Sequence, residues 1–410
     1  MMSKSFIKLP LLLLLLLSLA APAAAQESIP VLNAVVENHF GEHVTFSVDL
    51  PGELNIESVR IIIAMPGEFS SQSFPVTIGA NNHISFIYDF DKLSQFRPFS
   101  QVSYAYEVTL ISTPSNTISL TEELFFIYED NRFTWQTVNN NTPFTIHWYE
   151  GGEDFGQAVL EAATAAVKDS KDQIQLPIPR ALDIYVYASA AELQEALNLV
   201  DQSWAAGHAE TDLNLALVSI TPGEDQKNEI NRQIPHELMH IRLRQTYGNG
   251  FLLIPAWLNE GLASSAEINP PLEITQLLSA AFKNNALLSF SGLCQGFPED
   301  ATGANLAYDQ SVSFTRYLFD RFGVEGVQQL LSSYTAGEGC AAGFHQALGS
   351  SLAQVELNWQ LATFGSNPAE LAKVDFSPWL VLLGIILLSP FIVIIFNRKP
   401  IEETPDQAGV

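Results

Sequence analysis

Two histidines four residues apart, with a glutamate directly after the first, constrain this chain more than any other feature. They lie in the run His236-Glu237-Leu238-Met239-His240. In an α-helix, residues i and i+4 lie one above the other on the same face. If the run is helical, both imidazoles can reach one metal ion, and Glu237 lies beside it, where it can accept a proton from a water molecule. Because neutral imidazoles suit zinc, the run predicts a zinc site on a helix.

A second segment supplies a third ligand. Nineteen residues lie between His240 and Glu260, and Pro255 suits the first turn of a new helix, where its missing N–H costs nothing. Glu260 would then lie one to two turns into that helix and could complete the zinc site, with water as the fourth ligand. Taken alone, the glutamate is more often a solvated carboxylate and the histidines are more often incidental surface residues. The two segments together favour the zinc site.

These segments resemble a known family. The stretch Pro255–Ala263, which reads PAWLNEGLA, is similar to the Asn-Glu-Gly segment of gluzincin metallopeptidases of the peptidase MA-like family, related to the aminopeptidase N type. The resemblance covers about residues 132–360 and includes Ala307–Gln310. The chain lacks the Gly-Ala-Met-Glu-Asn segment that holds the substrate's free amine in aminopeptidases of that clan. Its His-to-Glu gap is also one residue longer, closer to the thermolysin pattern, so endopeptidase and aminopeptidase action both stay open.

The resemblance implies hydrolysis of a peptide or protein substrate with Zn²⁺ as the cofactor. It implies that His236, His240 and Glu260 hold the metal and that Glu237 is the general base. Tyr308 would stabilise the oxyanion, because related enzymes place a tyrosine downstream for this purpose. A tyrosine that only fills the core is the alternative.

Residues 1–25 are typical of a secretory signal peptide. Lys4 and Lys8 form a basic region, Leu11–Leu17 an apolar core, and Ala23–Ala25 the small residues before a cleavage site. An N-terminal membrane anchor is the alternative, but the apolar core is short for a membrane span.

The segment 376–396 predicts a transmembrane helix, because it is almost wholly apolar and a span takes about 20 residues. Arg398 and Lys399 follow it, which places the tail 397–410 in the cytoplasm. A buried core helix is the alternative. We therefore expect a single-pass protein of the cell membrane, with the lipid bilayer as a partner, residues 365–375 as a stalk and the catalytic domain outside the cell.

The chain is strongly acidic, with a formal net charge of −26 at pH 7. Such a surface repels nucleic acid, so no nucleic-acid partner is expected. Solubility outside the cell is enough to account for this charge.

The chain has two cysteines, Cys294 and Cys340. Both are expected on the exported side, where an oxidising compartment permits a disulfide. Two free buried thiols are the alternative. Neither cysteine has the close Cys partner that is typical of a zinc site.

Residues 26–128 predict a β-sandwich of immunoglobulin-like type, because strand-like runs alternate with turn signals. The expected strands are His43–Leu50, Val59–Ala64, His83–Tyr88, Val102–Ile111 and Leu120–Tyr128.

Residues 129–364 predict a zincin-type catalytic domain with a mixed sheet and helices, so the whole chain is α+β. The expected elements are strands at Phe144–Tyr149, Leu182–Tyr187 and Leu213–Ile220, a helix at Glu153–Ser170, and helices from Glu260 to about Thr363. The resemblance implies that the edge strand before the zinc helix, Leu213–Ile220, pairs with extended substrate. An ordinary buried strand is the alternative. His208 could touch substrate there, or it could be a surface histidine.

Two other functions compete with a secreted-side zinc peptidase. In the first, the chain is a surface binding or adhesion protein whose zinc domain is structural or catalytically inactive. Intact Glu237 argues against this, because a purely structural site needs no base. An intramembrane zinc protease is excluded, because the residues around His236 are polar and lie far from the apolar C-terminal segment.

Overall fold

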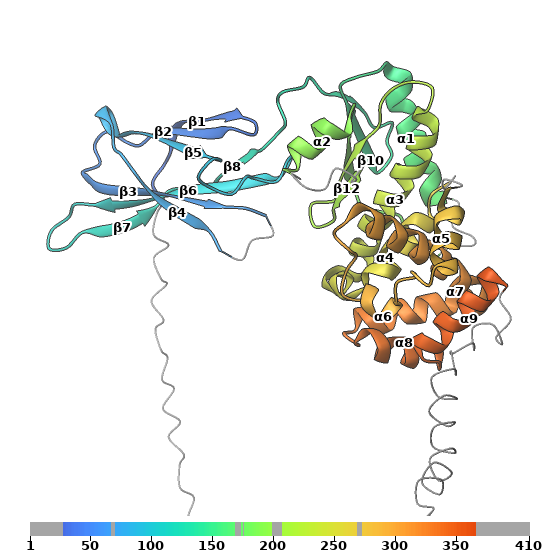
Figure 1. Ribbon diagram of the computed structural model, residues 1–410. Helices are drawn as coiled ribbons and strands as arrows, with labels where there is room; N and C mark the ends of the chain where they lie inside the picture. The colour runs from blue at the N-terminus through green and yellow to red at the C-terminus, as the bar shows by residue number, and fades with distance from the viewer. Residues whose placement is uncertain are drawn as a thin grey trace, which may run out of the picture. The chain divides into compact units, whose positions relative to one another are not determined.

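The computed structural model describes residues 28–66, 70–168, 174, 176–198, 207–268 and 273–365 (Figure 1). Its chain falls into two compact units that divide between Thr134 and Trp135, with residues 194–198 grouped with the first. We call them the N-terminal and the C-terminal unit. The predicted signal peptide and the predicted transmembrane segment lie outside the described residues. Among those described, no helix is both long and apolar enough to cross a membrane.

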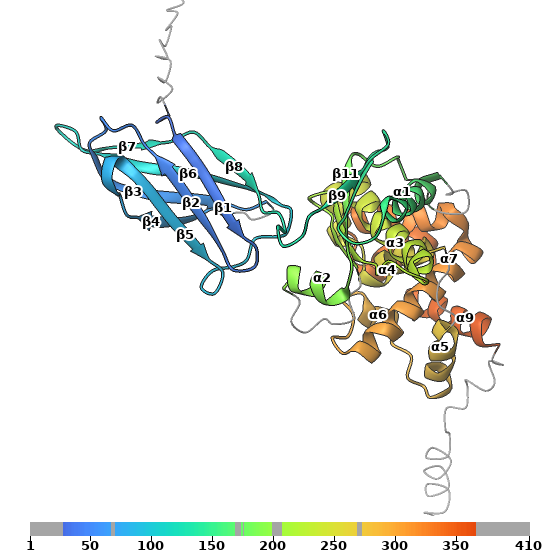
Figure 2. The ribbon, with the colours of Figure 1, turned by 90° about the horizontal axis from the view of Figure 1, so that it is seen from above.

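The N-terminal unit consists of two antiparallel sheets (Figure 2). One has the order β1-β2-β5, and the other has the order β4-β3-β6-β7, with β8 also paired to β6. The elements are β1 (Leu32–His39), β2 (His43–Asp49), β3 (Ile56–Ala64), β4 (Gln72–Val76), η1 (Ala80–Asn82), β5 (His83–Asp89), β6 (Gln101–Leu110), β7 (Thr117–Leu120) and β8 (Leu124–Ile127).

Strands β2, β3 and β6 of this unit alternate between buried apolar and more exposed residues, which is the pattern of a sheet with one face on a core. The ring of Phe46 on β2 meets that of Tyr104 on β6 at 4.9 Å and that of Phe126 on β8 at 5.5 Å. Inner side chains of the two sheets therefore pack against each other.

Two strand predictions in this unit need correction. The run Leu120–Tyr128 is not one strand, because Thr121 interrupts it and its hydroxyl accepts a hydrogen bond from the Tyr106 amide. The sequence also missed β1 and β4. Most of β1 is exposed, so this strand lacks the apolar alternation that would indicate it.

The C-terminal unit joins a five-stranded sheet to a set of helices, which confirms the predicted α+β class. Its elements are β9 (Gln136–Val138), β10 (Phe144–Trp148), α1 (Glu153–Lys168), β11 (Leu182–Tyr187), α2 (Ala190–Ala196), β12 (Gly207–Glu210), β13 (Leu215–Ser219), α3 (Gln226–Tyr247), η3 (Gly248–Leu253), α4 (Ala256–Ser265), α5 (Glu273–Lys283), α6 (Phe290–Leu293), α7 (Ala301–Thr335), α8 (Cys340–Leu348) and α9 (Leu352–Phe364).

The strand order of this sheet is β12-β13-β11-β10-β9. The three central strands are parallel, and β9 and β12 pair antiparallel at the two edges. The expectation that Leu213–Ile220 is the edge strand is therefore wrong, because β13 lies between β11 and β12. The edge strand next to β13 is β12. It has only four residues, and its sequence is too polar to predict a strand.

Helix α3 lies between two apolar cores. Ile234, Leu238 and Ile241 pack with the sheet and with α1. Met239 and Leu243 pack instead with Trp257 and the helices that follow. Because two faces of α3 are held in this way, the orientation of its remaining residues is fixed.

A disulfide joins Cys294, at the end of α6, to Cys340, at the start of α8, with a Cα–Cα distance of 6.2 Å. The prediction that these cysteines pair is confirmed. The bond joins the two helices that precede and follow the long α7 in the sequence.

Candidate metal centre

The histidines of the His-Glu-x-x-His run lie on one face of α3, as the sequence predicts. Gln233 on the same helix donates a hydrogen bond to the Ser219 carbonyl at the end of β13, with an N–O distance of 2.8 Å. This bond fixes α3 lengthwise against the sheet. His236 and His240 are largely buried, and their rings lie 5.0 Å apart, edge to face.

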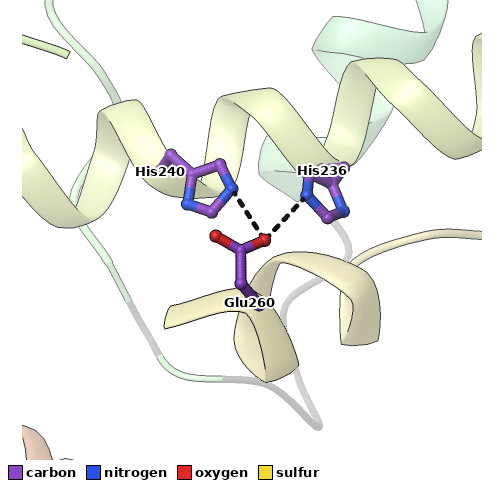
Figure 3. Close-up of side chains that lie close together, drawn as sticks. All are labelled: His236, His240 and Glu260. Carbon is purple, nitrogen blue, oxygen red and sulfur yellow. Dashed lines mark ion pairs between the residues drawn. The ribbon is translucent and has the colours of Figure 1, made fainter. Parts of the chain in front are cut away.

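Glu260 reaches the histidines from α4, which begins at Ala256 with Pro255 as its N-cap residue. Its Oε2 lies 3.5 Å from Nε2 of His236 and 3.6 Å from Nε2 of His240 (Figure 3). Gly261, the next residue, lets α4 approach α7 closely, because an added Cβ would lie 2.5 Å from the Ser311 carbonyl oxygen. The helix packing thus sets the depth of Glu260.

These three side chains fit a single metal ion. One ligand atom from each lies within 4.8 Å of the other two. Two atoms that each lie about 2.0–2.1 Å from one zinc ion, at a tetrahedral angle, are about 3.3 Å apart. The observed separations of 3.5 and 3.6 Å come close to this value. Two imidazole nitrogens and one carboxylate oxygen form a donor set that suits zinc.

The electrostatics of the cluster also favour a cation. Burial alone would lower the pKa of His236, but the contacts with Glu260 and Glu267 and the charge of Glu237 outweigh it and raise the pKa to about 10. Burial alone would raise the pKa of Glu260, but the charge of His240 and the contact with His236 outweigh it and lower the pKa. The carboxylates therefore favour a positive charge between the two imidazoles.

The other ring nitrogen of each histidine, Nδ1, also has a hydrogen-bond partner. Nδ1 of His236 lies 3.0 Å from Oε1 of Glu267, and Nδ1 of His240 lies 3.1 Å from Oδ1 of Asn259. The Ser264 hydroxyl lies 3.4 Å from the same Nδ1 of His236. The carboxylate and the amide oxygen can only accept, so each Nδ1 donates to them, and Nε2 is the ring nitrogen that faces Glu260 and would bind a metal ion in place of a proton.

Glu237 lies beside the cluster and is only 7% exposed. The backbone of Gly207 on β12 passes next to its carboxylate. A Cβ added at Gly207 would lie 3.0 Å from Cδ of Glu237 and closer still to Oε1. The edge strand of the sheet therefore forms one wall of the site, and it leaves room for the carboxylate only because residue 207 has no side chain.

Tyr308 lies on α7. Burial raises the pKa of its hydroxyl, and the negative charges of Glu260 and Glu237 raise it further. Tyr308 is therefore close enough for both carboxylates to act on it electrostatically. Because its pKa is raised, its hydroxyl stays protonated. The Phe297 ring packs edge-on against it at 5.0 Å.

His208 does not join the cluster. In the β12–β13 ladder it pairs with Leu217, whereas Gly207 pairs with Val218, which faces α3. Since neighbouring residues of a strand point to opposite faces, His208 faces away from α3. Its Nε2 lies 3.3 Å from Oε1 of Glu210.

The sequence analysis missed Glu267 and Gly207. Glu267 lies beyond the end of α4, where helix spacing gives no guidance, so no pattern in the sequence singles it out. No signal in the sequence marks Gly207, because its role depends on strand pairing.

Comparison with solved structures finds distant likenesses. A structure titled "Myokine structure" is 12% identical with a TM-score of 0.18 and covers 24% of this chain and 96% of its own. A redesigned β-sandwich protein is 12% identical with a TM-score of 0.18 and covers 25% and 96%. A purple acid phosphatase from yellow lupin (Lupinus luteus) seeds is 8% identical with a TM-score of 0.20 and covers 47% and 35%. These likenesses carry no argument, and a search of curated proteins found no match.

A family model gives the informative comparison. The model described as Peptidase MA superfamily matches residues 161–365, which is half of the 410-residue chain. The match contains α3, α4 and α7, so it includes the whole three-residue cluster. It supports a peptidase-like enzyme of a typically metal-dependent kind, and the chain belongs to the peptidase MA superfamily.

Proposed function

We propose that this chain is a zinc metallopeptidase of the gluzincin type, related to the aminopeptidase N and thermolysin enzymes. One observation carries the proposal: His236, His240 and Glu260 converge on one point, and the buried carboxylate of Glu237 lies beside them without being part of the set. A structural metal site needs no such additional carboxylate.

The residues divide the work. His236 and His240 would hold the ion through Nε2, and Glu260 through a carboxylate oxygen. Bound zinc polarises a carbonyl and lowers the pKa of water to about 7. Glu237 takes the proton of the attacking water and delivers it to the leaving amine. Tyr308 donates a hydrogen bond to the oxyanion that develops.

The edge of the sheet offers a place for the substrate. Within the described residues, β12 pairs with β13 on one side only. An extended peptide can add to such an edge through main-chain hydrogen bonds. Because Gly207 lies both on this strand and beside Glu237, a peptide bound there would run past the proposed base.

The location of the enzyme is a separate proposal. The signal-like segment 1–25, the apolar segment 376–396, and the Arg398 and Lys399 that follow it support a single-pass protein with its catalytic domain outside the cell. Protease added to intact cells should then remove the catalytic domain and leave a small membrane-bound fragment. Full protection of the domain in sealed cells would contradict this topology.

Mass spectrometry of a peptide library treated with the purified, zinc-loaded protein tests the activity. Internal cuts would identify an endopeptidase, and cuts only at free N-termini would identify an aminopeptidase. Glu237→Gln is the control, because it should bind zinc and cut nothing. If the wild-type protein binds zinc and cuts no unstructured peptide, the metallopeptidase proposal fails, and a surface binding protein with an inactive zinc domain becomes the better account.

A further inference from the structure

Pro235 interrupts the hydrogen-bond ladder of α3 one residue before His236. A proline inside a helix has no N–H, so the carbonyl four residues earlier, here that of Asn231, loses its usual donor. The proline ring also crowds that carbonyl and turns it away from the helix axis. No residue lowers the stability of a helix interior more than proline does. Its position in the middle of the metal-binding helix therefore calls for a physical reason.

The carbonyl released by Pro235 has a new donor. The backbone N–H of Ile268 donates to the Asn231 oxygen, with an N–O distance of 3.0 Å. Ile268 follows the end of α4, in the segment directly after Glu267. The gap that Pro235 opens in α3 is therefore filled by a backbone group from outside the helix.

This bond lies directly beside the contact that orients the first histidine. Pro235 precedes His236, and Ile268 follows Glu267. The Glu267 carboxylate, in turn, lies 3.0 Å from Nδ1 of His236, whereas Glu260 meets Nε2 of the same ring. Two adjacent bonds thus join α3 to the segment after α4, one between backbone groups and one between side chains.

We propose that Pro235 is a positioning residue of the metal centre. By leaving the Asn231 carbonyl free, it holds the backbone of Ile268 against α3, and this places the Glu267 carboxylate where it accepts the Nδ1 proton of His236. The Nε2 of His236 is then aimed at Glu260 before any ion binds. The proposal rests on the metal centre of the proposed function, but not on peptidase activity.

Pro235→Ala gives the main test, because stability and metal affinity should move in opposite directions. Alanine restores the N–H and competes with Ile268 for the Asn231 carbonyl, so the helix gains a bond while the segment after α4 is released. The thermal midpoint of the metal-free protein should equal or exceed that of the wild type. The zinc Kd should nevertheless weaken at least about 10-fold, the lower range for loss of a contact behind a metal ligand.

Changes at Ile268 test the donor side of the same bond. The Ile268 side chain is half exposed, so Ile268→Ala, which keeps the N–H, should leave the zinc Kd unchanged. Ile268→Pro removes the donor and also restricts the backbone of Glu267, so it should weaken zinc binding at least as much as Pro235→Ala does. The double variant Pro235→Ala/Ile268→Pro should be no worse than Ile268→Pro alone, because both changes break the same bond.

Amide hydrogen exchange of the metal-free protein provides a measurement that needs neither zinc nor activity. The Ile268 amide should be protected in the wild type and should exchange faster in Pro235→Ala. Unchanged protection at Ile268 would overturn the proposal, as would a zinc Kd that stays at the wild-type value in Pro235→Ala. If the wild-type protein binds no zinc, the proposed function fails, while the exchange experiment still decides whether Pro235 places this segment.

Discussion

Nδ1 of His236 lies 3.0 Å from Oε1 of Glu267, so a carboxylate from beyond the end of α4 orients the first histidine of the metal centre. The Glu267 side chain is 8% exposed, which shields the contact from water. By accepting the Nδ1 proton, Glu267 leaves Nε2 as the free nitrogen on the side that faces Glu260. The cluster is therefore arranged by contacts that lie outside the three ligands themselves.

Glu267→Gln should weaken zinc binding about 10- to 100-fold, the range for loss of a carboxylate behind a metal-bound histidine. The amide can still accept from Nδ1, but it no longer adds negative charge behind the ring. Competition with a chromophoric chelator measures the Kd. Glu161→Gln, an exposed carboxylate on α1, is the matched control and should leave the Kd unchanged. Equal affinities for Glu267→Gln and the wild type would show that Glu267 does not act on the metal.

Glu237→Gln and Glu260→Gln should separate catalysis from metal binding. Glu237→Gln keeps its size but cannot accept a proton, so zinc should stay bound while kcat falls by at least about 10²–10⁴-fold. Glu260→Gln removes a charged ligand, so zinc content and kcat should fall together. Elemental analysis beside a peptide assay distinguishes the two patterns. Normal activity in Glu237→Gln would rule out the proposed mechanism.

Gly207→Ala should displace the base and leave the fold in place. The new methyl group would collide with the movable end of the Glu237 side chain, so the carboxylate can give way at little cost in stability. A shift of about 1 Å in a catalytic group can cost about 100-fold in rate. We expect such a loss in kcat, with the thermal midpoint and zinc content retained. Gly152→Ala, where an added Cβ meets nothing within 4 Å, is the control.

Tyr308→Phe should lower kcat by about 10²–10³-fold, as expected for losing a donor to the oxyanion. KM and zinc affinity should change little, because the hydroxyl acts only on charge that develops during the reaction. Steady-state kinetics on a peptide that the wild type cleaves will separate the two constants. A variant with wild-type kcat would leave Tyr308 as a tyrosine of the core.

Asp309→Asn should change how stability depends on pH. Burial raises the pKa of Asp309 to about 7, and its Oδ2 has no hydrogen-bond partner among the residues that the structure describes. Between about pH 4 and pH 7 the unfolded chain releases a proton that the folded chain keeps, so this group lowers stability as pH rises. Asp309→Asn removes the effect. The thermal midpoint of the variant minus that of the wild type should therefore increase from about pH 4 to pH 8. A constant difference across this range would contradict the assignment.

Local spacing made much of the site predictable. The i, i+4 histidines and the new helix after Pro255 depend only on residues close in the chain, and the structure places both as expected. The strand Leu182–Tyr187 was likewise predictable, because apolar residues that face the core alternate with more polar ones. The α+β class follows from such local patterns.

The sequence by itself determined which residues can bind a metal, because helix periodicity alone brings His236 and His240 to one face. Only the tertiary structure decided how those residues are oriented. Three features depend on segments that are far apart in the chain. They are the edge position of β12, the close approach of Gly207 to Glu237, and the hydrogen bond from Ile268 to the Asn231 carbonyl that Pro235 leaves free. Such contacts depend on how sheet and helices pack, and a backbone N–H or a missing side chain leaves no pattern in the sequence from which to predict its partner.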